Sequence, residues 1–228
     1  MRIDMHNHTG WGSGDTHQHP SDLIERAKAW GLEGICFTEH NFVWDREKID
    51  QLREKHDFLV IAGVEIDTTD YDHVLAFGIP GPRRWSKLPT ALELRKVVDE
   101  HGGVMVRSHP FRKVSLPSHD DFRVPDVAKF LDWACSEAVY DLVEAVEGYN
   151  GLARPRETIL AKEMCRRLGK RTTGGSDAHR LNEAAVCFTV FHGAIRDDRD
   201  FIEALKAGDF HGGDWESEEL PDPRLYTY

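Results

Sequence analysis

The sequence predicts a single α/β domain whose strands close into a small barrel. Short apolar, strand-like runs alternate along the chain with amphipathic helical runs, and this alternation favours a parallel sheet covered by helices. Seven or eight such units are typical of a closed barrel, although a chain of 228 residues is short for eight full units. Coordinating side chains also follow the apolar runs, where barrels place their chemistry. We therefore expect a barrel with seven strands or with one irregular element.

Strand-like runs and helix-end signals define the individual elements. The predicted strands are residues 2–6, 34–38, 58–64, 73–78, 103–107, 142–148, 171–174 and 185–191. Pro20 is suited to the first turn of the first helix, and Gly31 follows the last turn. Thr90 and Glu93 have the spacing of a capping box for a helix that ends near 101–102. Two further helices are predicted, over 154–168 and from 197–198 to 208.

Composition limits the possible classes of function. The chain has 29 basic and 40 acidic residues and a net charge of -11, which argues against long nucleic acids as partners. No apolar run approaches the roughly 20 residues that cross a membrane. The first ten residues lack a secretion signal, so we expect a cytoplasmic protein. The four cysteines form no C-x-x-C pair and are expected to be reduced and structural.

Histidines and carboxylates gather at the ends of the predicted strands. His6 and His8 end the first strand and point to the same face, because side chains alternate along a strand. Any one such residue is weak evidence for a metal ligand. Together they would place costly buried charges in one cavity unless a cation compensated them, so the set predicts a metal site. The residues at or beside the later strand ends are Glu39, His40, Glu65, His73, His109, Glu147, Asn150, Asp177 and His179.

Five of these segments resemble, in order, the motifs of one known family. DMHNHT, FTEHN, GVEI, SHPFR and GGSDAH are similar to the motifs of the PHP family, named for polymerase and histidinol phosphatase domains. The resemblance implies a distorted (β/α)7 barrel with the metal site at the C-terminal ends of the strands. It also implies two or three divalent metal ions, for which Zn, Mn and Fe are equally suited to mixed imidazole and carboxylate ligands. The barrel domain is expected to span residues 1–215, and residues 216–228 to form a tail.

The resemblance assigns a role to each ligand. Glu65 is expected to bridge two ions and, with Asp177, to act in catalysis. In the loop after His8, Gly14 separates Ser13 from the expected ligand Asp15, so the family pattern is altered there and His17 or His19 stays an alternative. The implied groups are His6, His8 and Asp177 for the first ion, Glu65, His73 and His109 for the second, and Asp15, His40 and His179 for the third.

The expected activity is hydrolysis of a phosphate ester by metal-bound hydroxide. The substrate would be a small molecule or nucleotide, as a phosphomonoester or phosphodiester. Arg112 is the candidate for binding the phosphate, since a guanidinium matches two phosphate oxygens. Glu39 is expected to orient a ligand imidazole, and Glu147 and Asn150 to support the site or contact substrate.

Three other functions remain open from the sequence. Amidohydrolase-like barrels, which cleave C–N bonds, also begin with H-x-H, although their bridging group is usually a modified lysine where this chain has Glu65. A nuclease acting on short oligonucleotides is the second alternative. A metal-binding domain without catalytic activity is the third. The natural substrate, the number of ions and the oligomeric state are left open.

Overall fold

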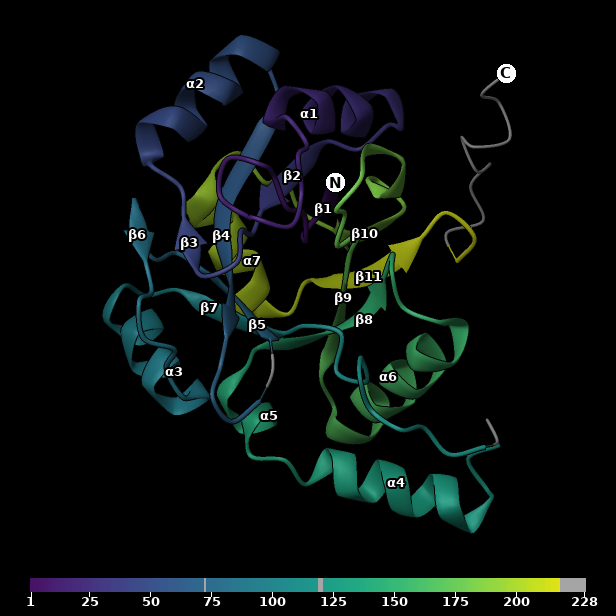
Figure 1. The fold of residues 1–228 in the computed structure, drawn as a ribbon. Helices are drawn as coiled ribbons and strands as arrows, with labels where there is room; N and C mark the ends of the chain where they lie inside the picture. Colours follow the sequence, from purple (N-terminus) through teal and green to yellow (C-terminus); the bar gives the residue numbers. More distant parts are fainter. Residues whose placement is uncertain (72, 119–120, 218–228) are drawn as a thin grey trace.

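The computed structural model describes residues 1–71, 73–118 and 121–217, and Figure 1 shows their arrangement. Within these residues the main sheet has nine strands, in the order β11-β10-β1-β2-β4-β5-β7-β8-β9. The strands are β1 (Arg2–Asp4), β2 (Gly34–Phe37), β4 (Leu59–Asp67), β5 (His73–Phe77), β7 (Val104–Arg107), β8 (Ala145–Asn150), β9 (Arg171–Gly175), β10 (Cys187–Phe191) and β11 (Phe210–Asp214).

The sheet curls round until the chain after β1 meets the chain after β9. Met5 N donates to Gly174 O at 3.3 Å, and Asp177 N donates to His6 O at 2.6 Å. Asn7 and Ala178 form a parallel bridge just beyond. The nearly closed ring therefore runs through β1, β2, β4, β5, β7, β8 and β9, while β10 and β11 continue the sheet beside β1. The predicted distorted seven-stranded barrel is confirmed.

Strand direction departs from the wholly parallel sheet that we expected. β5 is antiparallel to both β4 and β7, and β10 is antiparallel to β1 and β11. Because β5 is reversed, its first residue, His73, lies level with the C-terminal ends of the neighbouring strands and pairs with Asp67 at the end of β4. The reversal thus brings His73 to the same end of the barrel as the ligands that follow other strands.

Helices cover the sheet and the far end of the barrel. Figure 1 shows α1 and α2 on one side and α3 to α6 on the other. Thr90 and Glu93 form the predicted capping box of α3, and Asp197 caps α7 as predicted. The predicted strand at 142–148 is wrong at its start, where the short helix α5 lies. The helices are α1 (Pro20–Ala29), α2 (Arg46–His56), α3 (Ala91–Glu100), α4 (Pro125–Cys135), α5 (Val139–Leu142), α6 (Pro155–Leu168) and α7 (Asp198–Ala207).

An apolar cluster fills the barrel and leaves its other end for polar side chains. Phe77, at the end of the reversed strand β5, contacts Phe201 of α7 with ring centroids 5.1 Å apart. Phe191 and Phe210 lie in the same buried cluster. Since Phe77 ends the strand that His73 begins, α7 closes the end opposite His73. The end that carries the histidines lies away from α7, and His40 and His179 are partly exposed there.

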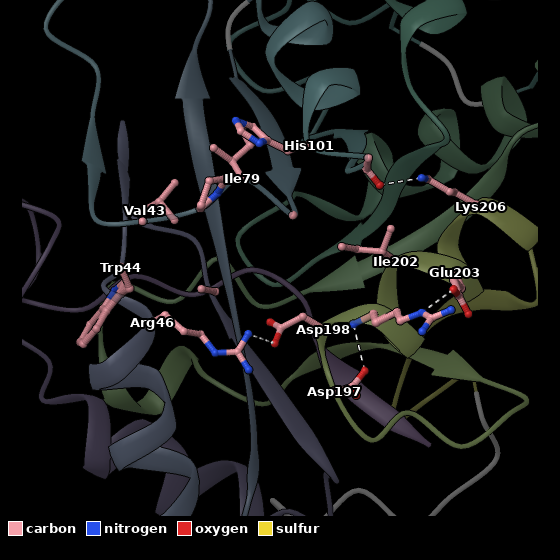
Figure 2. Close-up of a pocket in the computed structure, with 16 residues that line it drawn as sticks. Val43, Trp44, Arg46, Ile79, His101, Asp197, Asp198, Ile202, Glu203 and Lys206 are labelled. Carbon is pink, nitrogen blue, oxygen red and sulfur yellow. Dashed lines mark hydrogen bonds and ion pairs between the residues drawn. The ribbon is translucent and has the colours of Figure 1, made fainter.

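A side cavity and a small ribbon lie outside the barrel. β3 (Phe42–Val43) pairs with β6 (Arg83–Arg84). A cavity of about 630 Å³ lies between the segment after β3 and helix α7, where Trp44, Arg46 and Asp198 line it (Figure 2). The residues that outline this cavity include none of the predicted metal ligands, so its size does not mark the centre of the chemistry.

Three further expectations concern the cysteines, membrane segments and the tail. All four cysteines are free thiols, as predicted. Among the helices of the described ranges, none combines the length and the apolar character that crossing a bilayer requires. Most of the predicted tail, residues 218–228, lies outside the described residues.

Candidate metal centre

Glu65 is the hub of a group of histidines at the open end of the barrel. It is fully buried on β4. Its Oε1 lies 3.0 Å from His73 Nδ1, 3.0 Å from His109 Nε2 and 3.3 Å from His6 Nε2. Its Oε2 lies 3.2 Å from His40 Nδ1 and 3.4 Å from His8 Nε2. One carboxylate therefore faces imidazoles on both of its oxygens, which is the arrangement of a group that bridges two cations.

Asp177 supplies a second buried carboxylate from the chain after β9. Its Oδ1 lies 3.3 Å from His8 Nε2 and 3.5 Å from His6 Nε2. Its backbone has a positive φ of 53°. Gly175, two residues earlier, must lack a side chain, because a Cβ there would approach His6 Cβ to 2.4 Å. The glycine therefore lets the end of β9 come close enough for Asp177 to share a cavity with both histidines.

Asp4 fixes the turn that carries Asp177. It is completely buried and accepts hydrogen bonds from Ser176 N at 2.8 Å, from Ser176 Oγ and from Ala185 N at 3.1 Å. Burial raises the pKa of Asp4 to about 6 against these hydrogen bonds, which lower it. Sequence reasoning assigned no role to this residue, although it lies two positions before His6 in the first predicted strand and so shares its face.

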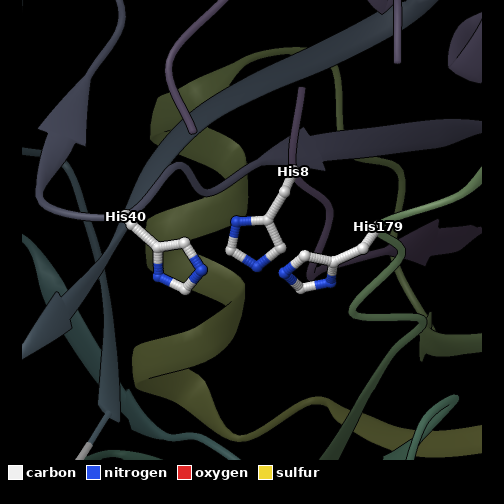
Figure 3. A group of neighbouring side chains, drawn as sticks. All are labelled: His8, His40 and His179. Atoms are coloured by element: carbon white, nitrogen blue, oxygen red, sulfur yellow. The ribbon is translucent and has the colours of Figure 1, made fainter. Parts of the chain in front are cut away.

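His40 and His179 lie nearer to solvent than the inner ligands, on either side of the buried His8. Figure 3 shows His8 between His40 and His179, with ring centroids 4.3 Å and 4.5 Å from His8. Asp15 Oδ2 lies 3.1 Å from His40 Nε2 and 3.0 Å from His179 Nε2. Of the loop candidates, Asp15 is thus the one placed between these two histidines, while His17 is exposed and His19 caps helix α1 through Nδ1.

Glu147 and Asn150 lie behind the inner histidines. Glu147 Oε1 lies 2.9 Å from His6 Nδ1, so it leaves Nε2 of that ring free to face Glu65. Glu147 Oε2 accepts from His109 N and from Asn150 Nδ2, both at 2.9 Å. The positions of Glu147 and Asn150 agree with the supporting role that we expected for them.

Glu39 was expected to orient an imidazole, and its carboxylate is linked to the histidines through the hydroxyl of Ser13. It accepts hydrogen bonds from Thr9 N, from Thr9 Oγ1, from Ser13 Oγ at 2.6 Å and from Trp44 Nε1 at 2.9 Å. Ser13 Oγ in turn lies 3.3 Å from His8 Nδ1 and accepts from His40 N at 3.1 Å. Among the described residues, Glu39 therefore acts on the histidines through Ser13, which the sequence analysis did not single out.

Arg112 lies at the rim of the group and is half-buried. It forms an ion pair with Asp177 Oδ2 and donates from Nη2 to Asn150 Oδ1 at 2.9 Å. The predicted phosphate-binding residue is thus beside the predicted ligand Asp177. A guanidinium has five N–H donors, so these two contacts leave others available.

Histidines and carboxylates shift one another's proton affinity strongly in this cavity. Burial alone would lower the pKa of His6, but Asp177, Glu65 and Glu147 together raise it well above its ordinary value. Burial lowers the pKa of His8 to about 4. Burial would raise the pKa of Glu65, yet the histidines around it, His6 first, hold it well below its usual range. The carboxylates therefore stay ionised and attract positive charge into a buried space.

The donor set fits divalent metal ions. Glu65 Oε2 and Asp177 Oδ1 are buried and accept no hydrogen bond from the described residues, and a buried oxygen without a partner is costly. His6 Nε2 and His8 Nε2 face each other at 3.1 Å, so at least one carries a lone pair towards the same space. Neighbouring triads suited to an ion are His6–His8–Asp177, His6–Glu65–His109, His40–Glu65–His73 and His8–His40–His179.

Comparisons with known proteins agree with this arrangement. The family model "PHP domain" matches residues 4–163, and the model "PHP-associated" matches residues 155–210. An uncharacterized protein of Methanocaldococcus jannaschii is 25% identical over 126 residues, which are 50% of this chain and 70% of that protein.

Two solved structures share the fold. A two-domain protein from Bacteroides vulgatus, containing a predicted PHP-like metal-dependent phosphoesterase, has a TM-score of 0.69 and 19% identity. The match covers 93% of this chain and 64% of that one, so this chain spans less than two thirds of it. An amidohydrolase from Chromobacterium violaceum, with bound sulfate and no metal, has a TM-score of 0.58 and 13% identity over 90% of this chain and 97% of that one. At these identities the structures show the fold, while the family model matches most of the sequence: the chain belongs to the PHP domain family.

Proposed function

We propose that this protein is a metal-dependent hydrolase that cleaves phosphate esters. The observation that carries the proposal is the pair of buried carboxylates, Glu65 and Asp177. One oxygen of each accepts no hydrogen bond from the described residues and faces the same space as the nitrogens of His6 and His8. Bound divalent ions would lower the pKa of water and stabilise charge on phosphoryl oxygens.

The residues divide into sets that would hold two or three ions. Glu65 would bridge, because Oε1 and Oε2 face different histidines. The first set is His6, His8 and Asp177, the second is Glu65, His73 and His109, and the third is Asp15, His40 and His179. Zn, Mn and Fe all suit this mixture of ligands.

Arg112 supplies the positive charge expected of a phosphate-binding residue. It lies on the loop after His109, with a guanidinium fixed by Asp177 and Asn150. Because that guanidinium is already oriented, it would bind two phosphate oxygens with little further loss of freedom. The proposed substrate is a small phosphate ester or a nucleotide, since the net charge of -11 disfavours long nucleic acids.

Metal analysis and an activity screen test the proposal together. The chain would be purified without added metal, analysed for metal content, and assayed with phosphate monoesters, phosphodiesters, short oligonucleotides and amides. The control is the double variant His6→Ala/His8→Ala. The proposal predicts two or three ions per chain and metal-dependent hydrolysis of a phosphate monoester or diester that the variant lacks. Cleavage of amides alone would indicate amidohydrolase chemistry. A chain that binds no metal after reconstitution with Zn, Mn or Fe would contradict the proposal.

A further inference from the structure

The imidazole of His73 lies between two carboxylates of the same strand. Its Nδ1 is 3.0 Å from Glu65 Oε1, and its Nε2 is 2.9 Å from Asp67 Oδ1. Glu65 and Asp67 are two residues apart on β4, so their side chains share one face, and Asp67 is the residue paired with His73 across the β4–β5 ladder. The position of Asp67 therefore follows from the register of the reversed strand.

Asn41 holds the Asp67 carboxylate in place. Asn41 Nδ2 donates to Asp67 Oδ2 at 2.7 Å, and Asp67 N donates to Asn41 Oδ1 at 3.1 Å. The backbone of Asn41 is itself tied to the site, because its N–H donates to Glu65 O at 2.8 Å. With Oδ2 bonded to Asn41, Oδ1 is directed to His73.

His6 offers an informative contrast. Glu147 contacts Nδ1 of His6 and leaves Nε2 for the centre. Asp67 contacts Nε2 of His73 and leaves Nδ1 for the centre. A carboxylate behind a ligand imidazole fixes both the ring orientation and the nitrogen that carries the proton. Opposite placement of the two carboxylates thus selects opposite ring nitrogens.

We propose that Asp67 is a positioning residue that keeps the proton of His73 on Nε2 and presents Nδ1 as the metal-binding atom. This inference rests on the proposed function, because it assumes that His73 binds an ion. It adds a residue that neither the motifs nor the family resemblance had assigned, and it specifies the atom through which one ligand acts.

The substitution Asp67→Asn tests this proposal most directly. The oxygen of an asparagine can still accept a hydrogen bond from His73. Its NH2 group would then face the NH2 group of Asn41, and two donors cannot form a hydrogen bond with each other. We expect one metal ion to bind about 10- to 100-fold more weakly, which is the usual effect of losing a carboxylate behind a ligand imidazole. A competition titration with a chelator, with metal content measured in parallel, gives this number without reference to activity.

A second variant restores the hydrogen-bond pattern. In Asn41→Asp/Asp67→Asn, the new aspartate accepts from the new asparagine, whose oxygen again faces His73. Aspartate also tolerates the positive φ of 55° at position 41. We expect this double variant to recover most of the lost affinity. Asp70→Asn is the matched control, since Asp70 lies in the same connection but accepts from Ala91 N at 2.9 Å; its affinity should equal that of the wild type.

Side-chain nitrogen NMR of the zinc-loaded chain gives an independent reading. Long-range proton–nitrogen correlations should show His73 with metal on Nδ1 and the proton on Nε2, and this pattern should be lost in Asp67→Asn. Metal on Nε2 in the wild type would overturn the inference, as would unchanged affinity in Asp67→Asn or a double variant as weak as the single one.

The two proposals can fail separately. Full metal binding by Asp67→Asn contradicts the role of Asp67 and leaves the hydrolase proposal intact. A wild type that binds no metal contradicts the hydrolase proposal. The metal-free spectrum still tests Asp67, because the His73 Nε2 proton should exchange with solvent more slowly in the wild type than in Asp67→Asn, where the contact is weaker.

Discussion

The inner and outer parts of the metal centre are built in different ways. In the inner part, the side chains of His6, His8 and Glu65 have no exposed surface, and that of Asp177 has 1%. In the outer part, 23% of His40, 24% of His179 and 49% of Asp15 are exposed. The inner ligands come from the ends of barrel strands, whereas Asp15 comes from the loop after β1. The two parts therefore differ in solvation.

Because of this difference, we expect the inner and outer ions to differ in binding affinity and in their distance from incoming substrate. Buried ionised groups are tolerated only when a cation or hydrogen bonds compensate them, so the inner part should hold its ions tightly. The outer ligands remain partly hydrated without an ion, and an ion there would replace fewer unfavourable contacts. We expect the outer ion to be the weakest bound, the first removed by chelators and the one nearest to incoming substrate.

The largest effect is expected for Glu65→Gln. The amide keeps the size of the side chain but removes the negative charge and one acceptor, in a place where Glu65 faces both inner and outer histidines. Removing one partner of a buried ion pair lowers the free energy of unfolding by about 3–5 kcal/mol. Because Glu65 faces the ligands of both parts, the metal content should drop in both, and activity should fall to background. Metal analysis checks this prediction. Retention of every ion would show that Glu65 does not bridge.

The next largest effect is expected for Glu147→Gln, which touches only the inner part. Its Oε1 lies behind His6, and its Oε2 accepts from His109 N. Loss of such a carboxylate usually costs about 10- to 100-fold in metal affinity or activity. Chelator titration should show weaker binding of inner ions with the outer ion unchanged. An equal loss in both parts would mean that the two are one cooperative unit.

Asp15→Asn probes the outer part in the complementary way. Asp15 lies about halfway out of the protein and contacts His40 and His179. We expect loss of the outer ion and a fall in activity of about tenfold, at the lower end of the range for residues that support a metal site, while the inner ions remain. His17→Ala is the control, because His17 is exposed in the same loop. Loss of the outer ion in His17→Ala instead would reassign the loop ligand.

The sequence predicted the barrel and the gathering of ligands because both depend on local patterns. Apart from Asp15, the ligands lie close to an end of an apolar run, and strand ends meet at one end of a barrel. The antiparallel direction of β5 and β10 was not predicted. The apolar pattern of a strand is the same whether the strand runs parallel or antiparallel to its neighbours. A signal was nevertheless present: five residues separate Asp67 from His73, whereas a parallel crossover needs a dozen or more.

Glu39 is linked to the histidines through Ser13, and the direction of its side chain explains why. Neighbouring side chains of an extended chain point to opposite faces, so a residue beside the ligand His40 should face away from it. Glu39 does so and binds Thr9, Ser13 and Trp44 instead. The sequence analysis assigned no role to Asp67. Its side chain shares a face with that of Glu65, but its contact with His73 became apparent only from the register of the reversed strand.

Ser13 joins the two parts, and its removal should have the smallest effect. Its hydroxyl donates to Glu39, lies beside His8 Nδ1 in the inner part and accepts from the backbone of His40 in the outer part. In Ser13→Ala, Glu39 keeps its contacts with Thr9 and Trp44, so the free energy of unfolding should fall by only about 1 kcal/mol. Denaturant unfolding measures this loss, and chelator titration measures the consequence for each ion. Because His40 is partly exposed whereas His8 is buried, the outer ion should weaken more. An equal weakening of both ions would mean that Ser13 transmits strain between the two parts.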